Sequence, residues 1–135
     1  MTRTRIVIAA VVALIVAFAA GYGFGGSGRF QLQNALEDAR TKLDVAEARG
    51  LVLDGRVSLY NVNFGDASRH FEEAKAPLRR VRERYQKIGK NAAAGSIGAA
   101  LAHVEEAQRL SGKLDQAANA KANEALEALR VAVSQ

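Results

Sequence analysis

Cysteine and tryptophan are absent from this chain, and Pro77 is its single proline. Without cysteine there are no disulfides, thiolate metal sites, cysteine nucleophiles or acylated cysteine anchors. The redox compartment stays open, because a protein without cysteine is compatible with either side of a membrane. Aromatic residues are also scarce, with five Phe and three Tyr in 135 residues.

The residues that are present favour helices. Apolar residues make up 49% of the chain, and alanine is abundant after residue 90. Ala, Leu, Glu, Arg and Lys are good helix formers, so this mixture predicts an all-α fold. A chain of 135 residues is long enough for one small domain.

The chain also lacks a block of like charge. Its net charge is +5, but Arg3, Arg5 and Arg29 all flank a hydrophobic stretch near the N-terminus. From Phe30 onward the chain contains 16 basic and 14 acidic residues, so this part is nearly neutral. A nucleic-acid-binding tail needs a concentrated basic block, so no nucleic-acid partner is expected.

The strongest signal is the hydrophobic stretch itself, Ile6–Phe24, which is nineteen residues without a charge. As a helix it would reach about 28 Å, close to the thickness of the bilayer core. Residues 1–28 are therefore predicted to be a membrane anchor with one transmembrane helix. A cleavable signal peptide is the alternative, because Ala17-Phe18-Ala19 forms a cleavage pattern.

Positive charge predicts the orientation of this segment. Two arginines precede the stretch and one follows it closely. The positive-inside rule then places the N-terminus in the cytoplasm and the remaining chain in the periplasm or outside the cell. A cleaved signal peptide would send the domain to the same side.

Beyond the anchor, apolar or small residues recur at alternating steps of three and four, which predicts amphipathic helices. In the first helix Gly50 marks either a close approach or an interruption, and Asn63 is predicted to cap the next helix. Pro77 would kink that next helix or begin a new one. The stripe of the first helix comprises Leu36, Ala39, Leu43, Ala46, Gly50, Leu53, Val57, Tyr60 and Phe64. The later stripes run Phe64, Ala67, Phe71, Ala74, Leu78, Val81, Tyr85 and Ile88, then Ile97, Ala100, Val104, Ala107 and Leu110, then Ala118, Ala122, Ala125, Leu129 and Val133.

An internal repeat lies within these helices. Residues 65–74 read GDASRHFEEA and residues 98–107 read GAALAHVEEA, with six of ten positions identical at a spacing of 33 residues. A fixed period of this length is typical of stacked helix-turn-helix units.

The residues of the first copy resemble a known repeat family. The pattern Phe64-x-x-Ala67-x-x-x-Phe71-x-x-Ala74, followed by Pro77, is similar to the second helix of a tetratricopeptide repeat. The resemblance extends over residues 51–112 and implies two helical hairpins stacked side by side. A juxtamembrane helix at 29–50 and a capping helix at 113–135 would flank them. Ser58 departs from the family pattern, which has an aromatic there, so an ordinary antiparallel bundle is the alternative.

No catalytic, cofactor or metal site is predicted. His70 and His103 occupy equivalent repeat positions, each followed by x-Glu-Glu, but neither helix presents a second ligand at the spacing one face requires. Adjacent acids such as Glu72 and Glu73 point about 100° apart on a helix, so they do not form a catalytic pair. The chain is accordingly not expected to be an enzyme.

These patterns predict an interaction module, an adaptor or scaffold that docks another, membrane-associated protein. The basic residues of the second helix suggest an anionic surface, with ordinary solvated helix as the alternative. The candidate contact residues are Tyr60, Asn61, Asn63, Arg69, His70, Arg79, Arg80, Arg84 and Lys87.

A structural role is the alternative function. The stripe from Leu36 to Phe64 could form a homo-oligomeric coiled coil, making the protein a tethered spacer or a small subunit of a complex. Ala39, Ala46 and Gly50 favour instead close packing of this stripe inside the chain's own bundle.

Overall fold

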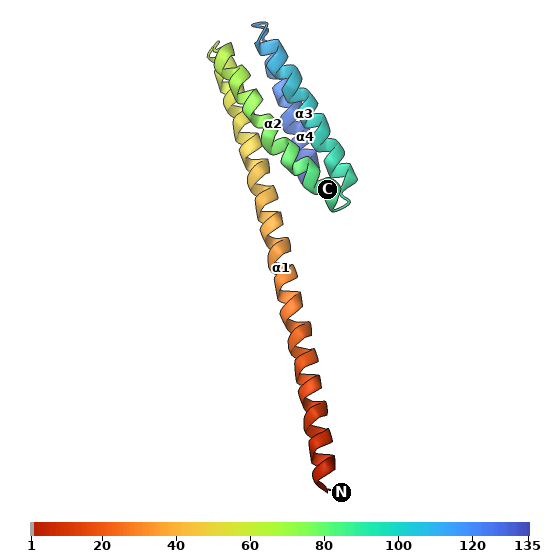
Figure 1. Ribbon diagram of the computed structural model, residues 1–135. Helices are drawn as coiled ribbons and strands as arrows, with labels where there is room; N and C mark the ends of the chain where they lie inside the picture. The colour runs from red at the N-terminus through yellow and green to blue at the C-terminus, as the bar shows by residue number, and fades with distance from the viewer. Residues whose placement is uncertain (1) are drawn as a thin grey trace. The chain divides into compact units, whose positions relative to one another are not determined.

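The computed structural model describes the backbone of residues 2–135 and the side chains of residues 13–17 and 28–135. The described backbone is helical without a strand, which confirms the all-α prediction (Figure 1). The helices are α1 (Thr2–Tyr60), α2 (Phe64–Lys87), α3 (Asn91–Ser111) and α4 (Ala118–Val133).

The chain divides into two compact units, the first ending at Ala39 and the second running from Arg40 to Gln135. The first unit is helical, and each of its described side chains is exposed to solvent. Among the residues whose side chains are described, no helix has the length and apolar character that a bilayer crossing requires. Most of the predicted anchor within residues 1–28 lies outside the described side chains.

The second unit packs its helices around one apolar core. Successive helices run antiparallel, with α3 against α2 and α4 against α3 (Figure 1). The fully buried large side chains are Val52, Leu59, Phe71, Leu78, Val81, Ile97 and Val104. The alanine stripe of α4 joins this core, since Ala118, Ala122 and Ala125 have no exposed surface. Small side chains let α4 approach its neighbours closely.

The turns between helices carry the residues that such turns need. Asn63 precedes α2, and its side-chain oxygen accepts a hydrogen bond from the Asp66 N–H at 3.2 Å, which confirms the predicted cap. Gly89 follows α2 with φ at +75°, a left-handed conformation that glycine adopts without strain.

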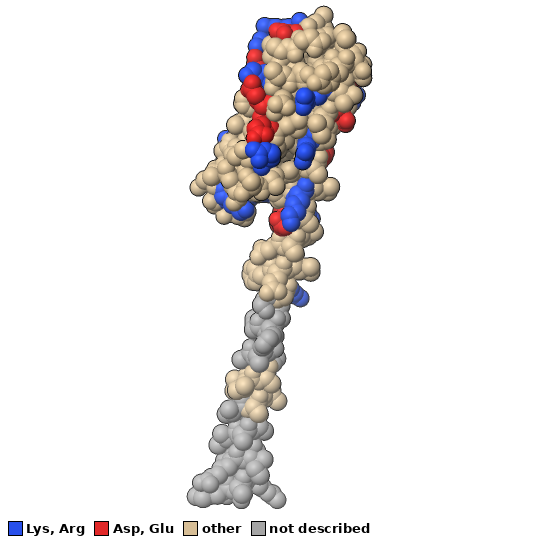
Figure 2. All heavy atoms as spheres, turned by 180° about the vertical axis from the view of Figure 1, so that it is seen from behind, with Lys and Arg blue, Asp and Glu red and all other residues tan. Residues whose placement is uncertain are grey.

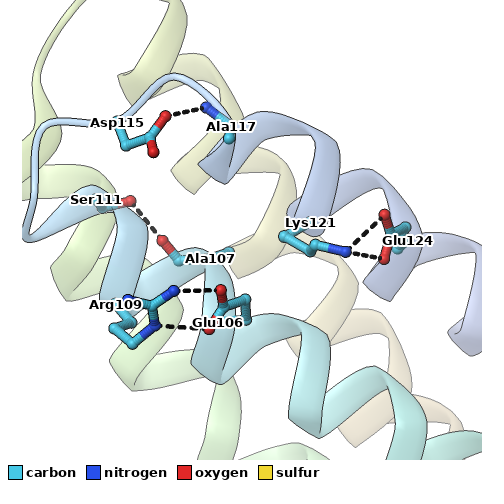
Figure 3. Close-up of polar contacts among 8 residues, drawn as sticks. All are labelled: Glu106, Ala107, Arg109, Ser111, Asp115, Ala117, Lys121 and Glu124. Carbon is cyan, nitrogen blue, oxygen red and sulfur yellow. Dashed lines mark hydrogen bonds and ion pairs between the residues drawn. The ribbon is translucent and has the colours of Figure 1, made fainter.

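Side-chain hydrogen bonds stabilise the end of α3 and the start of α4 (Figure 3). The Asp115 carboxylate accepts a hydrogen bond from the Ala117 N–H at 2.8 Å. At the end of α3 the buried Ser111 hydroxyl donates to the Ala107 carbonyl, also at 2.8 Å. Both bonds satisfy polar groups that a helix end or a buried hydroxyl would otherwise leave unpaired.

Pro77 lies inside α2, which continues from Phe64 to Lys87, so no new helix begins at the proline. Because proline has no N–H, the Glu73 carbonyl lacks its usual helical partner. The two copies of the repeat consequently lie in consecutive helices, α2 and α3. The resemblance to tetratricopeptide repeats stays a prediction.

The predicted stripes of α2, α3 and α4 are largely buried, and all five members of the α3 stripe are in the core. The stripe predicted for the first helix, which lies in α1, is not buried in the same way. Leu43 is 69% exposed, Val57 57% and Tyr60 68%. The expectation that this stripe packs inside the bundle is therefore wrong. The buried face of α1 comprises Thr41, Asp44, Ala48, Val52, Gly55 and Leu59.

Gly50 does not interrupt α1, which continues to Tyr60. Two features explain why the less apolar face is the buried one. Ala48 and Gly55 are small, so the neighbouring helix can approach closely. Asp44 is buried because it is paired with arginines of α2, which offsets the cost of removing its charge from water.

Candidate interaction surface

In the second unit α1 has apolar residues on two opposite faces. If Leu43 is given heptad position a, then Leu53 falls at d, and the buried Ala48 and Gly55 both fall at f. Position f lies opposite the a/d seam of a heptad helix. We call the exposed a/d face the α1 stripe; it comprises Leu43, Ala46, Gly50, Leu53, Val57 and Tyr60.

Two glycines show how differently these faces are occupied. A Cβ atom added at Gly55 would lie 2.5 Å from Cε1 of Phe71, so α2 fills all the space beside it. A Cβ added at Gly50 would have no heavy atom of the described residues within 4 Å. The α1 stripe is thus open where the opposite face is closely packed.

Charged residues border the α1 stripe on both sides. One border, at position g, is basic and comprises Lys42, Arg49 and Arg56. The other border, at position e, comprises Arg40, Glu47 and Asp54, so it is acidic in its last two members. Figure 2 shows Lys and Arg side chains interspersed with acidic and uncharged surface on one side of the second unit.

Arg56 connects α1 to α4. Its Nε donates to Oδ1 of Asn119 at 2.8 Å, and its Nη1 donates to Oδ1 of Asn123 at 3.2 Å. Hydrogen bonding by Asn119, with the hydrogen bond and charge of Arg56, also lowers the pKa of the Tyr60 hydroxyl. The end of the α1 stripe is therefore held by polar contacts from the C-terminal helix.

The candidate contact residues near the α1–α2 turn have different environments. Tyr60 and Asn61 are exposed, and Tyr60 belongs to the α1 stripe. Asn63 is occupied as the cap of α2. Arg69 is paired along its own helix with Asp66 at 3.3 Å and with Glu73 at 3.0 Å.

His70 is the most enclosed of these candidates, with 20% of its side chain exposed. Its Nδ1 is buried without a hydrogen-bond partner among the described residues, and Oε2 of Glu73 lies 3.8 Å away. His103 instead contacts Glu124 of α4, with 3.1 Å between Nδ1 and Oε2. Within the described part of the chain no three His, Asp or Glu side chains gather as metal ligands would.

The basic candidates on α2 separate into two kinds. Arg80 and Arg84 both face Asp44 of α1, so they are occupied in holding α1 against α2. Arg79 is exposed and lies 3.8 Å from Glu105 of α3. Lys87, near the end of α2, is also exposed. The structure therefore does not gather the predicted basic residues into one binding surface.

Asp44 is the central acceptor of this α1–α2 contact. Its Oδ1 accepts hydrogen bonds from Nε and Nη2 of Arg80 at 3.0 and 2.7 Å, and its Oδ2 accepts one from Nη1 of Arg84. Burial raises the pKa of this carboxyl, but the hydrogen bonds and charges of Arg80 and Arg84 outweigh burial and lower it below 3.8. Sequence analysis did not identify Asp44, because this residue follows Leu43 and lies beside the predicted stripe instead of within it.

Chemically, the α1 stripe is an apolar row with charged borders, an arrangement suited to another protein surface. The chain matches no protein-family model, no curated protein and no solved structure.

Proposed function

We propose that this protein is a membrane-anchored, non-enzymatic interaction module, an adaptor or scaffold whose helical unit docks a protein through the α1 stripe. The observation that carries the proposal is the exposure of Leu43, Leu53 and Val57, at 69, 41 and 57%. Apolar side chains aligned along one helix face are costly to leave in water unless a partner covers them.

The anchor is the Ile6–Phe24 segment, whose nineteen uncharged residues suit a bilayer core. Arg3 and Arg5 favour a cytoplasmic N-terminus and a helical unit in the periplasm or outside the cell. Anchoring confines the unit to two dimensions, which raises its effective concentration toward other membrane proteins. A modest docking surface is then sufficient for specific association.

The free energy gained by covering the α1 stripe is large enough for reversible docking. Fully burying a Leu or Val side chain contributes about 1.5–3 kcal/mol, and these side chains are already partly covered. A partner that covers Leu43, Leu53 and Val57 would gain about 1 kcal/mol from each. Such a gain supports reversible docking, which is what an adaptor needs.

Site-specific photo-crosslinking in native membranes tests this function. A photoreactive residue replaces Val57 on the stripe, and a matched control replaces Ala102, which is exposed on α3. We expect protein adducts from position 57, identified by mass spectrometry, and few from position 102. The absence of any protein adduct at position 57 would overturn the proposal.

A further inference from the structure

We infer that the occupant of the α1 stripe is a second copy of this chain, with the two α1 helices parallel across an a/d seam. The inference rests on the proposed function, because it uses the same exposed surface and names its partner. It is carried by the charges that border the stripe, because the basic g border meets the acidic Glu47 and Asp54 of the e border only in the parallel orientation.

The parallel orientation matches opposite charges. In a parallel two-stranded coiled coil, a g residue lies beside the e residue five positions later on the other helix. Arg49 of one copy then faces Asp54 of the other, and Lys42 faces Glu47. Two-fold symmetry makes each pair twice, so four attractive pairs border the seam.

The antiparallel orientation brings like charges together along the g border. There the g border of one helix lies along the g border of the other, and e lies along e. Lys42, Arg49 and Arg56 would then face basic residues only. Like charges directly opposite each other destabilise an association, so the borders select the parallel dimer.

The surroundings of these residues permit the contact. Arg49 and Asp54 are both exposed, so neither has to leave the core to pair. Glu47 already accepts a hydrogen bond from Arg80 at 3.1 Å, and a carboxylate has acceptor capacity for a further donor. Ala46 and Gly50 offer no bulk at the middle of the stripe, so the two backbones can approach closely there.

The parallel orientation also agrees with the proposed anchor. In a parallel dimer the Arg40 ends of both second units lie at the same end of the seam, as insertion of both copies into one membrane from one side requires. Small residues at Ala46 and Gly50 make the seam weak, and confinement in the membrane compensates by raising the local concentration. We therefore expect the dimer to be prominent in membranes and dilution-sensitive in detergent.

Cysteine crosslinking tests both the partner and the orientation, because the native chain has no cysteine. Leu43→Cys and Val57→Cys are introduced separately into the full-length protein, with Ala102→Cys as the exposed control off the stripe. The two stripe positions are about 21 Å apart along a helix. A parallel seam places each beside its own counterpart, so each variant forms a disulfide-linked dimer in native membranes on mild oxidation, well above the control.

An antiparallel seam would give the opposite pattern, with neither single variant linking above the control and with dimers only when the two variants are mixed. That result, or no crosslinking in any sample, would overturn the inference. If photo-crosslinks from position 57 then lead to a different protein, the proposed function stands and only its partner is wrong. If they lead to none, both proposals fail.

Exchanging the charges of Arg49 and Asp54 tests whether these two residues pair across the seam. Arg49→Glu and Asp54→Arg each turn both Arg49–Asp54 pairs repulsive, so each variant alone should lose about fivefold or more of its Val57→Cys dimer. Mixing the two variants, or combining both changes in one chain, makes the pairs attractive again and should restore it. Arg49, Asp54 and Val57 are all exposed, so helicity measured by circular dichroism should be unchanged. Equal crosslinking in every variant would contradict the inference.

Discussion

Arg80 of α2 donates two hydrogen bonds to Oδ1 of Asp44 in α1, at 3.0 and 2.7 Å, across 36 residues of sequence. Arg84, one turn further along α2, donates to the other carboxylate oxygen. One buried acid thereby accepts from two cations of the neighbouring helix. This contact fixes which face of α1 meets α2, and so which face is left exposed.

Asp44→Ala should lower the free energy of unfolding by about 1.5–3 kcal/mol, because it removes the charge-assisted hydrogen bonds that Arg80 and Arg84 make to α1. The measurement is chemical denaturation of the full chain in detergent, followed by circular dichroism. Glu83→Ala is the control, since Glu83 is an exposed acid on α2 outside this contact. Equal stability of the two variants would contradict a structural role for Asp44.

The lowered pKa of Asp44 makes part of the stability dependent on pH. A carboxyl with a lower pKa in the folded state binds fewer protons there than in the unfolded chain. Its stabilisation is complete above the unfolded pKa of about 3.9 and is lost as the pH falls through the lower folded value. The stability difference between wild type and Asp44→Asn, measured by denaturation, should therefore shrink below about pH 4. A constant difference from pH 6 to pH 2 would contradict this linkage.

Two alanine substitutions on α1 should have opposite effects. Gly55→Ala puts a Cβ 2.5 Å from the Phe71 ring and should cost about 1–3 kcal/mol through overpacking. In the monomer, at high dilution in detergent, Gly50→Ala meets open space and should stabilise the helix by about 0.5–1 kcal/mol. Thermal unfolding of the two variants checks the signs. If both lower the midpoint, Gly50 does not lie on an open face.

Asn63→Ala should destabilise the second unit by about 1 kcal/mol, because the Asp66 N–H at the start of α2 loses its acceptor. Asn63→Ser keeps an acceptor for that N–H without placing a second negative charge beside Asp66, whose carboxylate accepts from the Asn63 amide at 2.6 Å, and should retain most of the stability. Denaturation midpoints of the two variants give the comparison. A loss as large in Asn63→Ser as in Asn63→Ala would mean that the cap is not what Asn63 contributes.

The proposed orientation in the membrane predicts where the C-terminus lies. Ser134→Cys introduces one exposed cysteine near the end of the chain. A membrane-impermeant maleimide should label it from the periplasmic or external side without lysis. Labelling only after the cells are lysed would reverse the orientation.

Sequence periodicity was sufficient to identify the buried faces of α2, α3 and α4, because each of these helices has one apolar stripe. It was insufficient for α1, which has two. The stripe with larger residues, such as Leu43 and Leu53, was predicted to be the core face. The structure instead buries the face that contains Ala48 and Gly55. Periodicity shows that a face is apolar but not which neighbour covers it.

The candidate contact residues were limited in the same way. Arg80 and Arg84 form a basic cluster in sequence, which suggests an anionic partner outside the chain. Their partner is Asp44, which only the folding of α2 back along α1 brings near. Tyr60, in contrast, was predicted as a contact residue and does lie on the exposed stripe.

The two-faced character of α1 has a consequence for how this sequence can change. A helix on the surface of a bundle ordinarily has a solvent side on which substitutions accumulate freely. In α1 the f side is constrained by its contact with α2, and the a/d side would be constrained by whatever docks there. Substitutions would then be poorly tolerated on two sides of each heptad instead of one. We therefore expect the sequence of this segment to change more slowly than that of the other helices of the second unit.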